Sequence, residues 1–142
     1  MTTICYKAGI IAYDSRATAG GVIVDDEADK MTVARGVRFF IAGSPADFDR
    51  FLDIYFGESD TPVDINLCGF AVESGGALYK FGVNKTDGLW KQPHRAGCAA
   101  AIGSGGEFAL GAMDCGLSAK DAVGVAMKRD TGTGGKIRTF KL

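Results

Sequence analysis

The glycines of this chain constrain its fold more than any other feature. The sequence has 21 glycines among 142 residues, and they cluster between short apolar runs. Because glycine adopts the backbone conformations that tight turns require, this spacing predicts short strands joined by turns. We expect hairpins from 3–6 with 10–13, from 31–34 with 37–42, and from 66–73 with 77–83, and further strands at 89–91, 98–102 and 136–141.

Helical signals occupy other parts of the chain. Phe48, Phe51, Leu52 and Tyr55 are spaced to form one apolar helix face, between a capping Ser44-Pro45 pair and Gly57. Two more helices are expected near 107–115 and 118–129, the second beginning with a capping box of Ser118 and Asp121. Strands in blocks with segregated helices predict an α+β fold with layered sheets. Without a repeat or linker, we expect a single domain spanning 1–142.

Composition argues against several classes of protein. The net charge of −1 suggests no general attraction to nucleic acid or to an anionic membrane surface. No apolar run approaches the roughly 20 residues of a membrane-spanning helix, and the N-terminus lacks signal-peptide features. We therefore expect a cytoplasmic protein. The four cysteines are widely separated and there is one histidine, so no metal site is expected.

The first residues suggest a chemistry. If Met1 is removed, Thr2 carries a hydroxyl and a free α-amine with a pKa of about 8, which can serve as the base for that hydroxyl. The alternative interpretation is an ordinary strand start. A nucleophilic threonine needs a nearby positive charge, groups that orient the amine, and N–H donors for the oxyanion.

The chain offers candidates for each of these supports. Asp14 ends the strand that pairs with the first one, and Lys30 follows an acidic run. Backbone N–H groups are free at strand-to-helix junctions, where Gly43 and Ser104 are expected. Asp130 and Thr133 follow the last helix. Each has a structural alternative: Asp14 as a turn cap, Lys30 as a solvated side chain and Gly43 as a helix cap. The GSGG segment lacks the lysine of a phosphate-binding loop.

Several ordered motifs resemble those of the β-type proteasome subunits and the bacterial HslV peptidase, which are N-terminal nucleophile (Ntn) hydrolases. The motifs are MTTI, DSRATAGG, Lys30 at the family's distance from Asp14, FIAGSPAD, AIGSGGEFA, and RDTGTGGKI, with Thr133 where the family usually has serine. They span nearly the whole chain. The resemblance implies a four-layer α/β/β/α sandwich of two antiparallel sheets.

The resemblance also implies a role for each matching residue. Thr2 would be the nucleophile and base, Lys30 the ammonium that tunes it, and Asp14 the anchor of Lys30. Ser104, Asp130 and Thr133 would orient the amine and a water molecule, and the Gly43 N–H would bind the oxyanion. Thr18 would pair with the substrate backbone, and Ala17, Ala28 and Ile41 would line the first specificity pocket.

The activity implied is that of a threonine endopeptidase, with no metal or organic cofactor. It would act on peptides or unfolded proteins inside a homo-oligomeric ring, fed by an ATP-dependent unfoldase. Two alternatives are a catalytically silent structural subunit with the same fold and an amidase for small molecules.

Two departures from the family pattern bear on this interpretation. One helix is expected between the strands 37–42 and 66–73, where the family has two. The second family helix is thus missing, and its absence is expected to expose part of a sheet face. Met1 precedes Thr2, and a chain that retains Met1 has no free threonine amine, so that form is expected to be inactive.

Overall fold

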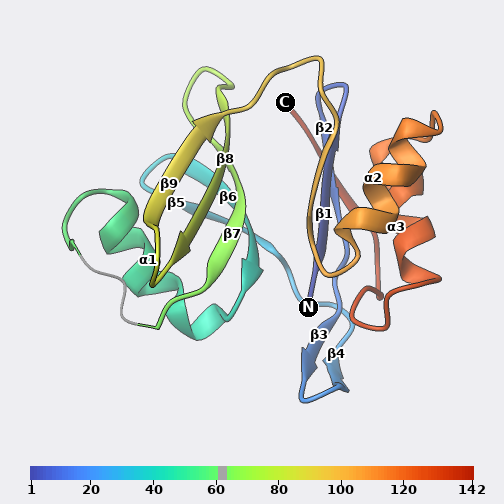
Figure 1. Ribbon diagram of the computed structural model, residues 1–142, viewed down its shortest axis with the longest axis horizontal. Helices are drawn as coiled ribbons and strands as arrows, with labels where there is room; N and C mark the ends of the chain where they lie inside the picture. The colour runs from blue at the N-terminus through green and yellow to red at the C-terminus, as the bar shows by residue number, and fades with distance from the viewer. Residues whose placement is uncertain (61–63) are drawn as a thin grey trace. The chain divides into compact units, whose positions relative to one another are not determined.

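A computed structural model describes residues 1–60 and 64–142 of the chain. The chain divides into two compact units (Figure 1). The first unit combines residues 1–30 with 95–142, and the second holds residues 31–94. The first unit is therefore built from both ends of the chain, and its sheet joins strands that are far apart in sequence. The expectation of a single domain stays a prediction.

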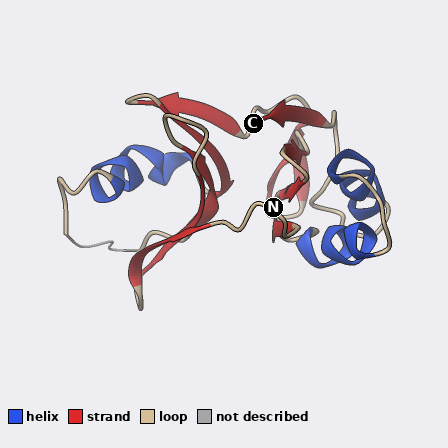
Figure 2. Ribbon diagram, turned by 90° about the horizontal axis from the view of Figure 1, so that it is seen from above, coloured by secondary structure: helices blue, strands red, loops and turns tan. Residues whose placement is uncertain are grey.

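The sheet of the first unit has the strand order β10-β1-β2-β11, with antiparallel neighbours. These strands are β1 (Thr3–Lys7), β2 (Ile10–Tyr13), β10 (Ala100–Gly103) and β11 (Arg138–Lys141). Helices α2 (Gly106–Asp114) and α3 (Ala119–Met127) cover one face of it (Figure 2). Small buried side chains fill the contact, namely Cys5, Ala12, Ala109, Ala122 and Ala126. Because they are small, the helices pack close to the strands.

A short hairpin extends from this unit. It consists of β3 (Ala17–Ala19) and β4 (Val22–Asp25), joined by Gly20 and Gly21. Both glycines have positive φ angles, which a tight turn of this kind requires. No strand was predicted here, although paired glycines between two apolar segments are a hairpin signal.

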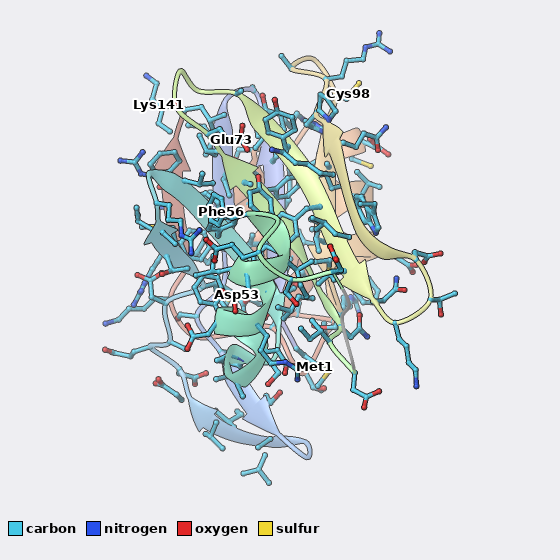
Figure 3. The ribbon with its side chains drawn as sticks, turned by 90° about the vertical axis from the view of Figure 1, so that its left-hand side faces the viewer. Met1, Asp53, Phe56, Glu73, Cys98 and Lys141 are labelled. Carbon is cyan, nitrogen blue, oxygen red and sulfur yellow. The ribbon has the colours of Figure 1, made fainter. Side chains whose placement is uncertain are left out.

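The sheet of the second unit is antiparallel and follows chain order. Its strands are β5 (Met31–Ala34), β6 (Val37–Gly43), β7 (Leu67–Val72), β8 (Leu78–Asn84) and β9 (Gly88–Pro93). Helix α1 (Phe48–Tyr55) follows a single 3₁₀ turn, η1 (Pro45–Asp47), and packs on one face of the sheet. Figure 3 shows this helix from its outer side, with Asp53 and Phe56 labelled. Phe39 contacts Phe51 and Tyr55 edge to face, which orients the helix.

Lys91, on β9, and Glu73, directly after β7, both contact Tyr55 of α1. Tyr55 donates a hydrogen bond of 2.9 Å to Glu73, and Lys91 forms an ion pair with the same carboxylate. The Lys91 ammonium also lies 4.9 Å from the Tyr55 ring centre and 4.1 Å from that of Tyr79. The large apolar side chains packed between α1 and the sheet are buried or half-buried. These side chains are the ones that α1 covers, so the expectation that another part of a sheet face is exposed stays a prediction.

Most predicted elements are present, with differences at their ends. Among the described residues, Ser44 makes no side-chain cap hydrogen bond, whereas Ser118 accepts one from the Asp121 N–H as predicted. Strand β11 begins at Arg138 and not at 136, because the backbone N–H groups of Gly134 and Lys136 bind the side chains of Asp14 and Ser15.

Two further expectations concern one connecting segment and membrane-spanning helices. The segment between the expected helix and the expected strand 66–73 includes residues 61–63, which lie outside the described residues. Within the described residues, the helices are all too short or too polar to cross a membrane.

Candidate active site

The register between β1 and β2 brings the start of one strand beside the end of the other. Thr3 opens β1, and Asp14 follows β2 directly. The Asp14 N–H donates to the Thr3 carbonyl at 3.2 Å, and the Thr3 N–H donates to Asp14 Oδ1 at 2.9 Å. Thr2 precedes β1 and is 4% exposed. The hairpin alone therefore places a carboxylate beside the N-terminal threonines.

Asp14 is fully buried, and hydrogen bonds surround it. Its Oδ2 accepts from the N–H groups of Arg16, at 3.2 Å, and Gly134, at 3.0 Å. Its Oδ1 accepts from Thr3 and lies 3.5 Å from Lys30 Nζ. A buried carboxylate is stable only when it is paired and hydrogen-bonded in this way. The structural alternative, a simple turn cap, does not account for the ion pair with Lys30.

Lys30 points at Thr2. Its Nζ donates to Thr2 Oγ1 at 2.6 Å and to the Arg16 carbonyl at 2.7 Å, and its side chain is 9% exposed. Burial lowers the pKa of Lys30, and the negative charge of Asp14 opposes part of that shift. The interpretation of Lys30 as a solvated side chain is therefore excluded. A cation in direct contact with a hydroxyl stabilises the alkoxide form of that hydroxyl.

A second cluster lies around Asp130. Its Oδ2 accepts hydrogen bonds from Ser104 Oγ at 2.6 Å and from Thr133 Oγ1 at 2.5 Å. Burial alone would raise the pKa of Asp130, but these hydroxyls, the Gly132 N–H and the charge of the chain's N-terminal amine outweigh it and lower the pKa. That amine belongs to Met1, which precedes Thr2 in this chain.

Thr3 links this cluster to β1. Its Oγ1 lies 2.6 Å from Thr133 Oγ1. Because the Thr133 hydroxyl donates its proton to Asp130, the Thr3 hydroxyl is the donor in this contact. The resulting chain of hydroxyls runs from Thr3 through Thr133 to Asp130 and is buried at the first two residues.

Met1 occupies the same region. Thr2 Oγ1 donates to the Met1 carbonyl at 2.7 Å, and Lys30 Nζ lies 3.2 Å from that oxygen. The Met1 side chain lies against Gly132, where a Cβ atom would approach the Met1 Cβ to 2.3 Å. With Met1 attached, the Thr2 nitrogen is an amide and cannot act as a base.

The structure brings Thr2, Asp14, Lys30, Ser104, Asp130 and Thr133 together within the first unit. Ala17 and Thr18 lie on β3 and are half-buried, as is Ala28, whose N–H donates to the Ser15 carbonyl. Their substrate contacts stay predictions.

Gly43 and Ile41 belong to the second unit and are described there. Gly43 ends β6 with a φ of 140°, and a Cβ at this position would lie 2.2 Å from Leu67 Cδ2. Ile41 is half-buried and packs against the core beneath α1. Their roles in an oxyanion site and a specificity pocket stay predictions.

Sequence reasoning missed three residues that hold the site together: Thr3, Ser15 and Arg16. All three lie next to residues that were selected, within MTT and DSR. Their contacts join segments more than ten positions apart in the chain, so local patterns gave no separate signal for them. Among the described residues, no three potential metal-ligating side chains gather into a metal site.

Comparison with known proteins supports the fold. No protein-family model and no curated protein sequence matches this chain. Among solved structures, the eukaryotic HslV from Trypanosoma brucei superposes with a TM-score of 0.71, covering 99% of this chain and 100% of that one at 18% identity. The chain has the fold of HslV.

The HslV fold is also shared with a second solved protein. Thiobacillus denitrificans BPH matches with a TM-score of 0.63 at 21% identity, covering 99% of this chain and 96% of BPH. BPH in complex with epoxomicin gives the same TM-score at 20% identity. The resemblance to HslV that the sequence motifs carry is thus confirmed at the level of the fold, over nearly the whole chain.

Proposed function

We propose that this chain, after removal of Met1, is a threonine-type endopeptidase whose nucleophile is Thr2. The observation that carries the proposal is the 2.6 Å contact between Lys30 Nζ and Thr2 Oγ1, with Lys30 held by the buried Asp14. A silent site has no need of a buried lysine aimed at a threonine hydroxyl, because burying a charge costs free energy.

The reaction begins at the Thr2 hydroxyl. The free α-amine takes the hydroxyl proton, and Oγ1 attacks the carbonyl carbon of a substrate amide. The Lys30 ammonium stabilises the negative charge on Oγ1 as it develops. The amine then gives its proton to the leaving nitrogen as the C–N bond breaks, and an ester to Thr2 remains. A water molecule, with the amine again as base, hydrolyses that ester and releases a carboxylic acid.

The remaining residues support these steps. By the family resemblance, Asp130 orients the Thr2 amine together with the Ser104 and Thr133 hydroxyls, which donate hydrogen bonds to it. The resemblance assigns stabilisation of the oxyanion to the Gly43 N–H. It assigns strand pairing with the substrate backbone to Thr18 on β3. The resemblance assigns Ala17, Ala28 and Ile41 to the first specificity pocket. By the same resemblance, the chain assembles as a homo-oligomeric ring that an ATP-dependent unfoldase supplies.

The test requires a protein that begins with Thr2. A cleavable fusion that leaves Thr2 as the first residue provides it, and the Met1-bearing protein and Thr2→Ala are the matched controls. Each protein is incubated with epoxomicin, whose epoxyketone reacts with a hydroxyl and a neighbouring free amine, and its intact mass is measured. We expect one adduct on the Thr2 form and none on either control.

The other outcomes separate the alternatives. A Thr2 form without an adduct and without cleavage of peptides would contradict the proposal and favour the silent structural subunit. Labelling that persists in Thr2→Ala would show that Thr2 is not the nucleophile. Hydrolysis of small amides without hydrolysis of peptides would favour the amidase.

A further inference from the structure

Arg16 contacts both the Asp14–Lys30 pair and the loop that carries Asp130 and Thr133. Its backbone joins the Asp14–Lys30 pair, because its N–H donates to Asp14 Oδ2 at 3.2 Å and its carbonyl accepts from Lys30 Nζ at 2.7 Å. The position of the Arg16 backbone therefore affects the direction of Lys30 and the hydrogen bonding of Asp14.

The side chain of Arg16 reaches two loops. Its Nε and Nη2 form a two-point contact with the Asp26 carboxylate, at 2.8 and 3.2 Å. Its Nη1 donates to the Thr131 carbonyl at 3.3 Å, in the loop that carries Asp130 and Thr133. A planar guanidinium makes such contacts at fixed angles, which a lysine cannot reproduce.

Gly134 shows how closely this side chain is packed. A Cβ atom on Gly134 would lie 2.3 Å from Arg16 Cζ and 2.4 Å from its Nε. The Gly134 N–H in turn donates to Asp14. The guanidinium thus lies directly on the segment whose backbone completes the hydrogen bonding of the buried carboxylate.

Ser15 joins the same segments through hydrogen bonds to their backbone groups. Its Oγ donates to the Asp26 carbonyl and accepts from the Lys136 N–H, each at 2.6 Å. Its N–H donates to the Gly134 carbonyl and its carbonyl accepts from Ala28, two residues before Lys30. The loops that the Arg16 side chain contacts are therefore also joined through Ser15.

We propose that Arg16 is a positioning residue, which holds Lys30 and the Asp130–Thr133 loop in register with Thr2 through its contacts with Asp26 and Thr131. Lysine has a flexible four-carbon side chain, so the direction of Lys30 depends on its acceptors. A displacement of about 1 Å in a catalytic group can lower a rate about 100-fold. The inference deepens the proposed peptidase function and rests on it for the rate measurement alone.

The variants are Arg16→Ala, Arg16→Lys, Asp26→Ala and the double variant Arg16→Ala/Asp26→Ala, each in the form that begins with Thr2. The matched control is Lys136→Ala. Lys136 and Glu27 pair at 2.7 Å between the same two loops, but both side chains are about two-thirds exposed. Two quantities are measured: amide hydrogen exchange over residues 130–136 and the rate of epoxomicin labelling.

We expect Arg16→Ala to raise exchange over 130–136 and to slow labelling at least tenfold, while Lys136→Ala changes neither. Arg16→Lys keeps a charge for Asp26 and recovers part of the rate. The double variant should be labelled no more slowly than Arg16→Ala, because both substitutions remove the same contact between Arg16 and Asp26. A loss of kcat at unchanged KM for a peptide substrate would agree with positioning.

Unchanged exchange in Arg16→Ala would overturn the inference, and so would an effect that Lys136→Ala reproduces. If the double variant lost labelling rate by the product of the two single-variant factors, that result would also overturn the inference. If Arg16→Ala does not fold, Asp26→Ala alone carries the comparison with Lys136→Ala. If the parent Thr2 form is not labelled, the proposed function fails, and the exchange measurement still decides the role of Arg16.

Discussion

At the scale of single residues, the candidate site depends on side chains that have almost no free space. Thr3 and Thr133 are fully or nearly fully buried, and their hydroxyls are 2.6 Å apart. Gly105 lies beside them, and a Cβ there would meet Thr3 Oγ1 at 2.2 Å and Thr133 Oγ1 at 2.7 Å. Its φ of −89° is open to any residue, so lack of space alone requires glycine here.

Gly105→Ala should therefore impair the site and the stability together. Threonine is stiff at χ1, so Thr3 can yield only by breaking its hydrogen bond to Thr133. We expect a loss of about 1–3 kcal/mol in unfolding free energy, as for other overpacked cores, and slower epoxomicin labelling of the Thr2 form. Urea unfolding and labelling rates measure the two effects.

Gly111→Ala is the matched control for that substitution. Gly111 lies within α2, the helix that Gly105 caps, and no described atom beyond the nearby helix backbone stands within 4 Å of a Cβ added there. Replacing a helical glycine with alanine stabilises by up to about 1 kcal/mol, so this variant should gain stability and keep its labelling rate. Equal behaviour of the two alanine variants would contradict the packing argument.

At the scale of elements, helix ends are held in two different ways. Ser118 caps α3 through the N–H of Asp121, a contact between residues three apart. Helix α2 ends differently: Lys7, from the end of β1, donates to the carbonyls of Met113 at 2.7 Å and Leu117 at 2.8 Å. The first contact was predicted from the local sequence. The second joins residues more than 100 positions apart and could not be.

Lys7→Ala should destabilise the first unit. The substitution leaves the Met113 carbonyl at the end of α2 and the Leu117 carbonyl in the following connection without a charged donor, and such contacts stabilise by about 1–2 kcal/mol. Thermal and urea unfolding measure the loss. The control is Lys120→Ala at an exposed position of α3, where little change is expected. A Lys7→Ala protein as stable as the Lys120→Ala protein would show that the cap contributes nothing.

At the scale of the whole molecule, several carboxylates make stability depend on pH in the acid range. Hydrogen bonds from Ser104 and Thr133 outweigh burial and lower the pKa of Asp130. Contact with Lys91 likewise lowers the pKa of Glu73, and contact with Arg35 lowers that of Glu58. A carboxylate with a lowered folded pKa adds stability above its unfolded pKa and loses it as pH falls through the folded value.

The unfolding free energy should therefore fall as the pH drops below the ordinary values of 3.8 for aspartate and 4.5 for glutamate. Urea unfolding at about pH 7 and about pH 3 measures the difference. High salt screens the exposed Glu58–Arg35 pair, so the loss that remains in salt reports on Asp130 and Glu73. Equal unfolding free energies at the two pH values would contradict the prediction.

The sequence alone determined the order of the main strands and helices, the Ser118 cap and the residues at the centre of the candidate site. It did so because glycine turns, apolar spacing and caps act over a few residues, and because Thr2, Asp14, Lys30, Ser104, Asp130 and Thr133 lie in recognisable motifs. Only the tertiary structure decided how far apart their atoms lie. It also decided that Thr3, Ser15 and Arg16 connect them and that β11 begins late. Those features arise from hydrogen bonds between the two ends of the chain, which form only when β1, β2 and β11 join one sheet.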